Sequence, residues 1–246
     1  MQQYFVKGEA KSSVIIEDKD TVKHMFQVMR LAKDDQVILV FDDGIKRLAR
    51  VADENDHRFE LIKALPDQVE LPVNVAIACG FPKGDKLEFL AQKTTELGAS
   101  QLWGFPADWS VVKWDGKKIT KKVEKLQKIA LGAAEQSKRN QVPEVNLFAS
   151  KAEFLAMLDQ FDTILIAYEE SAKTGERTAL VEVLSRLTSG EKILFIFGPE
   201  GGLSPNEVAQ FEAKGACKVG LGPRIMRAET APLYALSATS FALEMQ

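Results

Sequence analysis

The sequence predicts an α/β protein in two parts, a small β-rich N-terminal domain followed by a larger domain built on a parallel sheet. Three observations carry this prediction. Residues 1–70 contain short β-rich segments separated by turns. From residue 73 onward, apolar strands alternate with amphipathic helices, which is typical of a parallel sheet covered on both faces. Residues 64–72 carry two prolines and no clear period, so we place the boundary there.

The N-terminal domain is expected to span residues 1–70. Strands are predicted at 14–16, 36–41, 46–51 and 59–62, with Asp42-Asp43-Gly44 as a hairpin-type turn before the third. One short helix is expected at 21–29. Because no segment between the strands has room for a crossover helix, the pattern favours a small barrel.

The second domain is expected to span residues 73–246. Its strands are predicted at 73–79, 101–105, 163–167, 192–197 and 217–221, and its helices at 85–97, 119–137, 151–158, 178–187, 205–213 and 232–245. Ligands of such sheets bind at the carboxyl ends of the strands. The loops after Ala167, Phe197 and Gly220 are therefore the expected binding region.

Residue types at the helix starts predict how three of these helices begin. Asp85 with Glu88, and Ser204 with Glu207, have the spacing of a capping box, in which each side chain bonds the other residue's backbone N–H. Thr230 is expected to cap the last helix.

Composition excludes several classes of protein. No apolar run approaches the length of a membrane span, and the first residues lack a basic stretch followed by an apolar one. We therefore expect no signal peptide, no membrane helix and a cytoplasmic location. Cys79 and Cys217 lie in apolar, strand-like segments and are expected to be buried free thiols. Neither has ligand-spaced histidine neighbours, so no metal site is expected.

Basic residues are concentrated in one segment of a chain whose net charge is −3. Between Lys113 and Arg139 nine lysines and arginines face only three acidic residues. This pattern fits the solvated face of a helix about as well as a phosphate-facing patch, which counterion release would favour.

A glycine-rich loop follows the apolar strand that ends at Phe197. It reads Gly198-Pro199-Glu200-Gly201-Gly202 and precedes the helix start at Ser204. Glycines without a Cβ let another group approach the backbone closely. The loop lacks the spacing of a phosphate loop or a dinucleotide fingerprint, and taken alone it is also compatible with a plain tight turn.

A second loop, residues 219–232, also leaves a strand through glycines and enters a helix. It holds Arg224, Arg227 and Glu229 between that strand and helix. Taken alone, this pattern is also typical of an exposed loop held by salt bridges. Two such loops at strand ends in the same half of the domain favour a small-molecule cleft.

These two loops, read as Phe197 to Ser204 and Leu221 to Ala231, closely resemble the SPOUT methyltransferases, specifically the RsmE family of 16S rRNA uridine-N3 methyltransferases. The resemblance covers essentially the whole chain. It also includes Tyr4-Phe5-Val6, the segment His24 to Arg30, the segments 83–86 and 92–98, Ser110 to Lys113, and Ala133 to Arg139. Met226 and Pro232 are its two departures, and both are conservative.

The resemblance implies a C-terminal SPOUT domain with a deep trefoil knot and a PUA-like, RNA-binding N-terminal barrel. It implies S-adenosylmethionine bound in a bent conformation, a homodimer with the site at the subunit interface, and methylation of one uridine on the assembled small ribosomal subunit. The cofactor-binding residues it implies are Ala167, Tyr168, Glu169, Phe197, Gly198, Pro199, Glu200, Gly201, Gly202, Leu221, Gly222, Ile225, Met226, Arg227, Thr230 and Ala231. The RNA-binding candidates are Arg30, Lys113, Lys121, Lys122, Lys138 and Arg139.

Catalysis is expected to centre on an arginine. The N3 imide of uridine must lose its proton before it attacks, and an arginine beside the uracil carbonyls would favour the anion. Arg227 is the first choice and Arg224 the second. Glu229 is expected to orient an arginine or accept a proton, and a plain salt bridge fits it equally well. His24 and His57 fall in the barrel and are expected at the surface or against RNA.

Other functions remain open on the sequence alone. A SPOUT enzyme acting on another RNA atom, such as a ribose hydroxyl, would need the same cofactor loops. A non-catalytic RNA-binding or assembly factor would keep the fold without the reaction. A nicotinamide-dependent enzyme is disfavoured, because the glycine spacing is wrong and lies late in the chain.

Overall fold

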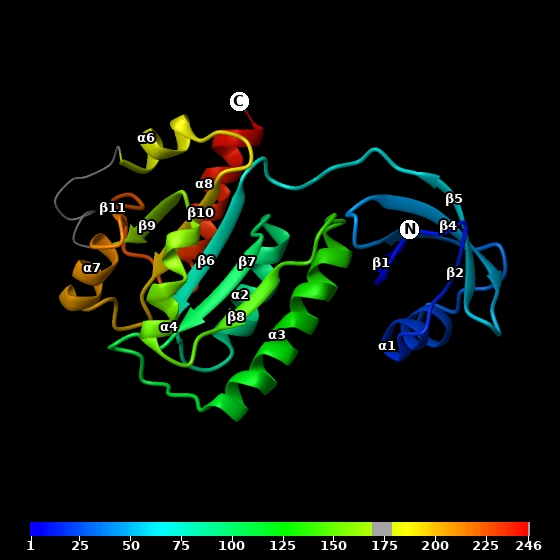
Figure 1. The fold of residues 1–246 in the computed structure, drawn as a ribbon, viewed down its shortest axis with the longest axis horizontal. Coiled ribbons are helices and arrows are strands. Elements are labelled where there is room, and N and C mark those ends of the chain that lie inside the picture. The colour runs from blue at the N-terminus through cyan, green and yellow to red at the C-terminus, as the bar shows by residue number, and fades with distance from the viewer. Residues whose placement is uncertain (169–178, 246) are drawn as a thin grey trace. The chain divides into compact units, whose positions relative to one another are not determined.

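The computed structural model describes residues 1–168 and 179–245, and these form two compact units. The N-terminal unit consists of residues 1–70 together with residues 134–141. The C-terminal unit consists of residues 71–133 and those from 142 onward. Figure 1 shows both units and labels most of their elements.

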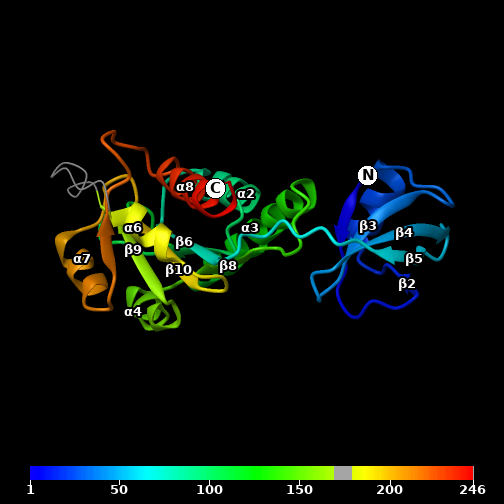
Figure 2. The same ribbon diagram turned by 90° about the horizontal axis from the view of Figure 1, so that it is seen from above.

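The N-terminal unit is a curled five-stranded sheet with the strand order β1-β3-β4-β5-β2 (Figures 1 and 2). β1 pairs with β3 in parallel, and the other pairs are antiparallel. The strands are β1 (Gln3–Phe5), β2 (Ser13–Ile15), β3 (Gln36–Val40), β4 (Lys46–Asp53) and β5 (Arg58–Ala64). Two register shifts between β4 and β5 help such a short sheet to curl. The predicted small β-domain is confirmed.

The helix predicted at 21–29 is present, with an unusual second half. It begins as α1 (Lys19–Val22), capped by the Asp18 carboxylate, and continues as the π-helical η1 (Lys23–Val28). Met25 in η1 is fully buried and packs with Tyr4, Leu39 and other strand residues. The sequence pattern could not distinguish a π-helical turn from an α-helical one.

The segment 134–141 is fixed to the N-terminal unit by a dense set of polar contacts around Glu70. The Glu70 carboxylate accepts hydrogen bonds from the buried guanidinium of Arg139 and from the backbone N–H of Asn140 and Gln141. The Asn140 side chain donates to the Gly44 carbonyl at 2.9 Å. These hydrogen bonds supply partners to the polar groups of residues 139–141 where the segment packs in the N-terminal unit.

Arg139→Ala is therefore expected to destabilise the protein by about 3 kcal/mol, because it leaves a largely buried carboxylate without its cation. Urea unfolding of the full chain measures the change. Lys117→Ala, at an exposed position on α3, is the matched control and should change stability little. Equal midpoints for the two variants would contradict the structural role of Arg139.

The C-terminal unit is built on a six-stranded, all-parallel sheet with the order β11-β9-β10-β6-β7-β8 (Figure 1). Its strands are β6 (Asn74–Gly80), β7 (Gln101–Phe105), β8 (Glu144–Leu147), β9 (Thr163–Ala167), β10 (Lys192–Phe197) and β11 (Cys217–Val219). Its helices are α2 (Lys86–Glu96), α3 (Gly116–Gln136), α4 (Lys151–Ala156), the 3₁₀ turn η2 (Leu158–Gln160), α6 (Ala179–Arg186), α7 (Pro205–Glu212) and α8 (Ala231–Glu244). The last residues of α3, from 134 onward, belong to the N-terminal unit. The predicted parallel sheet is confirmed, with β8 as an additional short edge strand.

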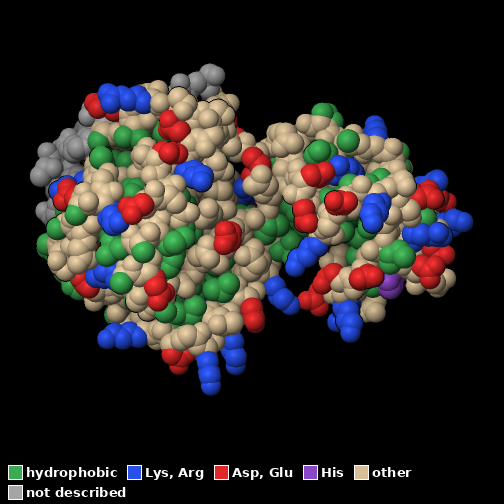
Figure 3. Space-filling model, in the orientation of Figure 1, with side chains coloured by type: hydrophobic (Ala, Val, Ile, Leu, Met, Phe, Trp, Pro, Cys, Tyr) green, Lys and Arg blue, Asp and Glu red, His purple; other side chains and the backbone are tan. Residues whose placement is uncertain are grey.

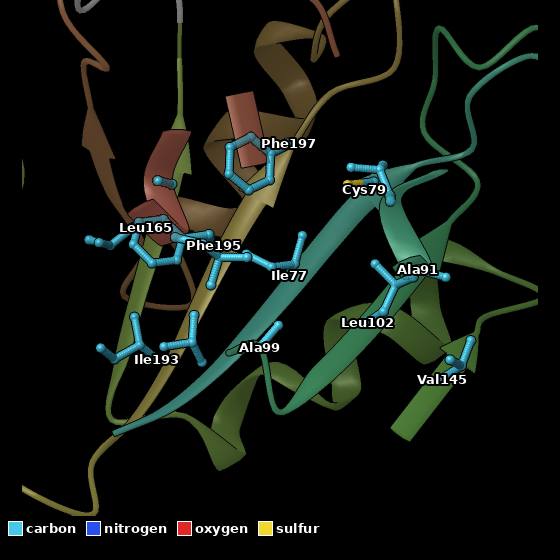
Figure 4. Close-up of a cluster of buried hydrophobic side chains, with 14 of the residues drawn as sticks. Ile77, Cys79, Ala91, Ala99, Leu102, Val145, Leu165, Ile193, Phe195 and Phe197 are labelled. Atoms are coloured by element: carbon cyan, nitrogen blue, oxygen red, sulfur yellow. The ribbon is translucent and has the colours of Figure 1, made fainter. Parts of the chain in front are cut away.

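Alternate strand residues point to opposite faces of this sheet, and both faces are covered. On one face Ile77, Leu165 and Phe195 pack with buried residues of α2, α3, α6 and α8 (Figure 4). On the other, Ala78 and Ile196 pack with buried residues of α4 and α7. Figure 2 shows α2, α3 and α8 on one side of the sheet and α4 on the other. This double cover explains why the strands are apolar throughout.

Of the three predicted caps, one is confirmed. Ser204 and Glu207 form the full capping box at α7. Asp85 makes no side-chain cap, because its backbone (φ −99°, ψ 7°) is not extended as a cap requires. Thr230 is already helical (φ −90°, ψ −39°), and its side chain makes no cap either. Both of those predictions were wrong.

The cysteines differ from each other. Cys79 is buried, which raises the pKa of its thiol to about 12. Cys217 is exposed, contrary to the prediction, because β11 is a three-residue strand at the edge of the sheet.

Among the described residues, no helix is long and apolar enough to cross a membrane, and no group of three or more metal-ligand side chains is assembled.

Candidate functional site

Three neighbouring strands of the parallel sheet, β11, β9 and β10, end at the same edge. The register pairs Val219 of β11 with Ala167 of β9, and Ile166 of β9 with Ile196 of β10. The three strands therefore end side by side, and the loops after them begin at Tyr168, Gly198 and Gly220. The predicted binding residues of these loops are thus brought to a common edge, except Glu169, which lies outside the described residues.

The glycine loop after β10 is folded tightly on itself. The N–H of Gly202 donates to the Pro199 carbonyl at 2.8 Å, and Gly202 has a φ of +80°, which favours glycine. A Cβ placed on Gly198 would lie 2.5 Å from the carbonyl carbon of Gly202. The loop can therefore close only because Gly198 and Gly202 lack side chains.

The loop after β11 presents its two arginines to solvent. Arg224 and Arg227 are both exposed, and Ile225 between them is 75% exposed. The Arg227 carbonyl accepts the N–H groups of Thr230 and Ala231, which fixes its backbone to the start of α8. The Arg227 guanidinium is thus carried on an anchored backbone.

Lys86, at the start of α2, joins the two loops. Its Nζ lies 3.0 Å from Glu200 Oε1 in the glycine loop and 3.0 Å from Glu229 Oε2 in the second loop. The backbone N–H of Lys83 donates to the same Glu200 oxygen. Lys86 lies in the segment 83–86 of the family resemblance, but no role was predicted for it, because a lysine in the first turn of a helix is ordinarily a solvated residue.

This bridge fixes the charge state of its members. Hydrogen bonds to Glu200 and Glu229 raise the pKa of Lys86. The bond from Lys86, with a smaller contribution from the charge of Arg227, lowers the pKa of Glu229. Partial burial opposes ionisation of Glu200, but bonds from backbone N–H groups and Lys86 outweigh it and lower its pKa. Both carboxylates are therefore ionised near neutral pH, and a carboxylate held in this way is a weak base.

A second polar cluster holds the loop after β7 against the start of α7. Its centre is Glu207, a fully buried carboxylate that accepts the N–H of Asp108 at 2.8 Å and the Nζ of Lys151 at 3.0 Å. The Asp108 carboxylate in turn accepts the Ser204 hydroxyl at 2.6 Å and also binds Lys151. Bonds from Lys151 and Ser204 lower the pKa of Asp108, so this carboxylate is ionised and paired within the cluster.

The lysine-rich helix is partly an exposed basic surface. Lys113 and Lys121 are exposed, and Figure 3 shows lysine and arginine side chains projecting near the start of α3. Lys122 is less available, because its Nζ lies over the ring of Trp114, 4.5 Å from the centroid. Lys125 is paired with Glu88 at 2.6 Å.

Two candidates for RNA contact lie in the segment 134–141 instead. Arg139 is only 3% exposed and bound to Glu70, so it presents no cation to a phosphate, and we remove it from the predicted surface. Lys138 donates to the Met1 carbonyl at 3.1 Å.

The candidates in the N-terminal sequence lie at the surface. Arg30 is exposed. His24 is exposed too, and its Nδ1 lies 3.1 Å from the Tyr4 hydroxyl.

Comparison with known proteins agrees with this architecture. An RNA methyltransferase domain model matches residues 69–240, and an RNA methyltransferase PUA domain model matches residues 16–63. Ribosomal RNA small subunit methyltransferase E of Bacillus subtilis is 43% identical, over all of this chain and 98% of its own.

Two solved structures share the fold over nearly the full length. A Legionella pneumophila protein, described as a methyltransferase with the cofactor SAM bound, is 26% identical with a TM-score of 0.84, over 98% of this chain and 97% of its own. Ribosomal RNA small subunit methyltransferase E of Neisseria gonorrhoeae, bound to S-adenosyl methionine, is 27% identical with a TM-score of 0.80 and the same coverage. This chain belongs to the RNA methyltransferase family that the two domain models and these relatives define.

Proposed function

We propose that this protein transfers a methyl group from S-adenosylmethionine to N3 of one uridine in 16S rRNA on the small ribosomal subunit. The names of the relatives support ribosomal RNA of the small subunit as the substrate. The structures solved with bound SAM support SAM as the cofactor. The observation that carries the proposal is the Lys86 bridge, which joins the glycine loop and the arginine loop at the carboxyl edge of a parallel sheet.

The loops have the properties that this cofactor requires. The glycine loop offers backbone without Cβ atoms, and Gly222 in the second loop also has a positive φ (+90°). Bound SAM supplies an activated methyl on a sulfonium. We assign its binding to the described residues of the three loops: Ala167, Tyr168, Phe197 to Gly202, Leu221, Gly222, Ile225 to Arg227, Thr230 and Ala231.

Arg227 is proposed as the residue that makes uridine reactive. The N3 proton must leave before the nitrogen can attack, and a guanidinium near the uracil carbonyls stabilises the resulting anion. Arg224, exposed in the same loop, is the second choice. Glu229 is ionised and bound to Lys86, so it fits an orienting role better than that of a proton acceptor.

The remaining parts of the proposal concern assembly and substrate. The N-terminal unit, together with Lys113 and Lys121, would bind RNA. The chain would form a homodimer, because α8 exposes Tyr234 and Phe241 and the neighbouring α2 exposes Phe89. We include in the proposal the deep trefoil knot of the C-terminal chain and a cytoplasmic location.

The proposal is tested by two measurements. Calorimetry should show SAM binding to the purified protein, and mass-spectrometric mapping should find one 16S uridine without its N3 methyl in cells that lack this protein. RNA binding without SAM binding would indicate a non-catalytic factor instead. Loss of a ribose methyl would indicate another SPOUT reaction.

Lys86→Met is expected to weaken SAM binding about tenfold, since two carboxylates would then lie together without the ammonium that joins their loops. Calorimetry measures the affinity, and Lys86→Arg should restore part of it. The control is Lys83→Met, because Lys83 reaches Glu200 through a backbone N–H that the substitution keeps. Equal affinities in Lys86→Met and Lys83→Met would show that the bridge does not shape the site.

A further inference from the structure

Trp109 is an exposed aromatic side chain next to the glycine loop. It lies in the loop between β7 and α3, and 48% of its surface is exposed. A Cβ built on Gly201 would lie 3.1 Å from Trp109 Cβ, and one built on Gly202 would lie 3.9 Å from its ring atom Cζ3. Trp109 therefore lies along Gly201 and Gly202, with its Cβ close to Gly201 and its ring edge at van der Waals distance from Gly202.

The loop that carries Trp109 is anchored on both sides of this residue. Before it, Asp108 is bound by Ser204, Lys151 and the buried Glu207. After it, the buried Ser110 donates its N–H to the Ala107 carbonyl at 3.0 Å. The backbone on which the indole is mounted is thus fixed, although the ring itself is half-exposed.

Further along the same loop, an aromatic contact holds the chain at Trp114. Trp114 packs on Phe81 with ring centroids 4.3 Å apart, and Lys122 covers its ring. The exposed lysines of α3 begin directly after this point. An anchored aromatic surface that continues into a basic surface is the combination with which proteins hold single-stranded nucleic acid.

We propose that Trp109 stacks on an unpaired nucleobase of the RNA substrate, at or next to the methylated uridine. This inference rests on the proposed function, because it takes the substrate to be RNA. An indole offers a flat face to any base, so it contributes affinity and placement rather than recognition of one base. The adenine ring of the cofactor is the other planar group that would reach the glycine loop, and the test separates the two.

The first test follows tryptophan fluorescence during titration with a short single-stranded oligoribonucleotide that carries the target uridine. The chain has three tryptophans, and Trp103 is buried, so the difference between wild type and Trp109→Phe isolates the signal of Trp109. Wild type should be quenched, Trp109→Phe should lose that component, and an abasic nucleotide at the target and flanking positions should quench much less. Equal quenching by the abasic oligonucleotide would overturn the inference.

The second test uses small subunits from cells that lack the protein. Trp109→Ala should raise the KM for the particle about tenfold, with SAM affinity unchanged and partial rescue by Trp109→Phe. Met157→Ala, at an apolar side chain of similar exposure directly after α4, is the matched control. A loss of SAM affinity with unchanged KM for the particle would assign Trp109 to the cofactor and overturn the inference.

The two proposals fail separately. If wild type is quenched by the oligonucleotide but transfers no methyl group to the small subunit, the base-stacking proposal holds and the proposed reaction is wrong. If wild type methylates the particle and Trp109→Ala does so with the same KM, the reaction stands and base stacking is wrong.

Discussion

Arg227→Ala is expected to lower the single-turnover rate of methyl transfer roughly a hundredfold, the scale seen when one preorganised electrostatic donor is removed. The guanidinium would matter most when the uracil anion forms, and less when the particle binds. The affinity for the small subunit should therefore change little, because one contact among many contributes modestly. Rapid quenching of a single turnover, at saturating SAM and with enzyme in saturating excess over the particle, measures the rate.

Two further observations identify the chemical role of Arg227. Arg227→Lys should recover only part of the rate, since an ammonium keeps the charge and loses the planar fork. Raising the pH should recover part of the rate of Arg227→Ala, because the imide then ionises without help. Lys121→Glu, on the exposed face of α3, should instead weaken particle binding and leave the saturated rate nearly unchanged. A wild-type rate at saturation for Arg227→Ala would make Arg227 a binding residue only.

Gly198→Ala should reduce SAM affinity about a hundredfold, because the new Cβ would lie 2.5 Å from the carbonyl carbon and 2.8 Å from the Cα of Gly202. Backbone cannot rotate away as a side chain can, so the glycine loop must open. Gly201→Val should have a smaller effect, since a Cβ there lies 3.1 Å from Trp109 Cβ. Calorimetric titration with SAM ranks the two variants.

The control for this loop is Gly132→Ala. A Cβ on Gly132 has no neighbour within 4 Å, and the residue lies inside α3, where alanine is favoured over glycine. This variant should bind SAM as wild type does and be slightly more stable. Wild-type affinity in a folded Gly198→Ala protein would mean that the cofactor does not depend on the closed loop.

Features that depend on neighbours in the chain were predictable from the sequence. The Ser204–Glu207 capping box needs only a spacing of three residues, and the alternation of strands and helices needs only hydrophobic periodicity. Asp85 shows the limit of such spacing, because its residue type is suited to a cap and its backbone is not.

Features that depend on partners far along the chain were not predictable. Lys86 and Arg139 look alike as isolated cations, yet one bridges two loops and the other is buried against Glu70. The contact of Trp109 with Gly201 joins positions 92 residues apart, and no local pattern indicates it. The short edge strand β8 was missed because it buries only Val145.

The inclusion of residues 134–141 in the N-terminal unit has a consequence for how the protein is synthesised. Chains fold as they leave the ribosome, with N-terminal domains generally first. Here the Glu70 carboxylate, the Gln3 amide and the Gly44 carbonyl receive their partners from Arg139 and Asn140. The nascent N-terminal unit therefore lacks these polar partners until residues 139 and 140, which follow α3, have been translated. Maturation of the two units is coupled in time, even though each has its own core.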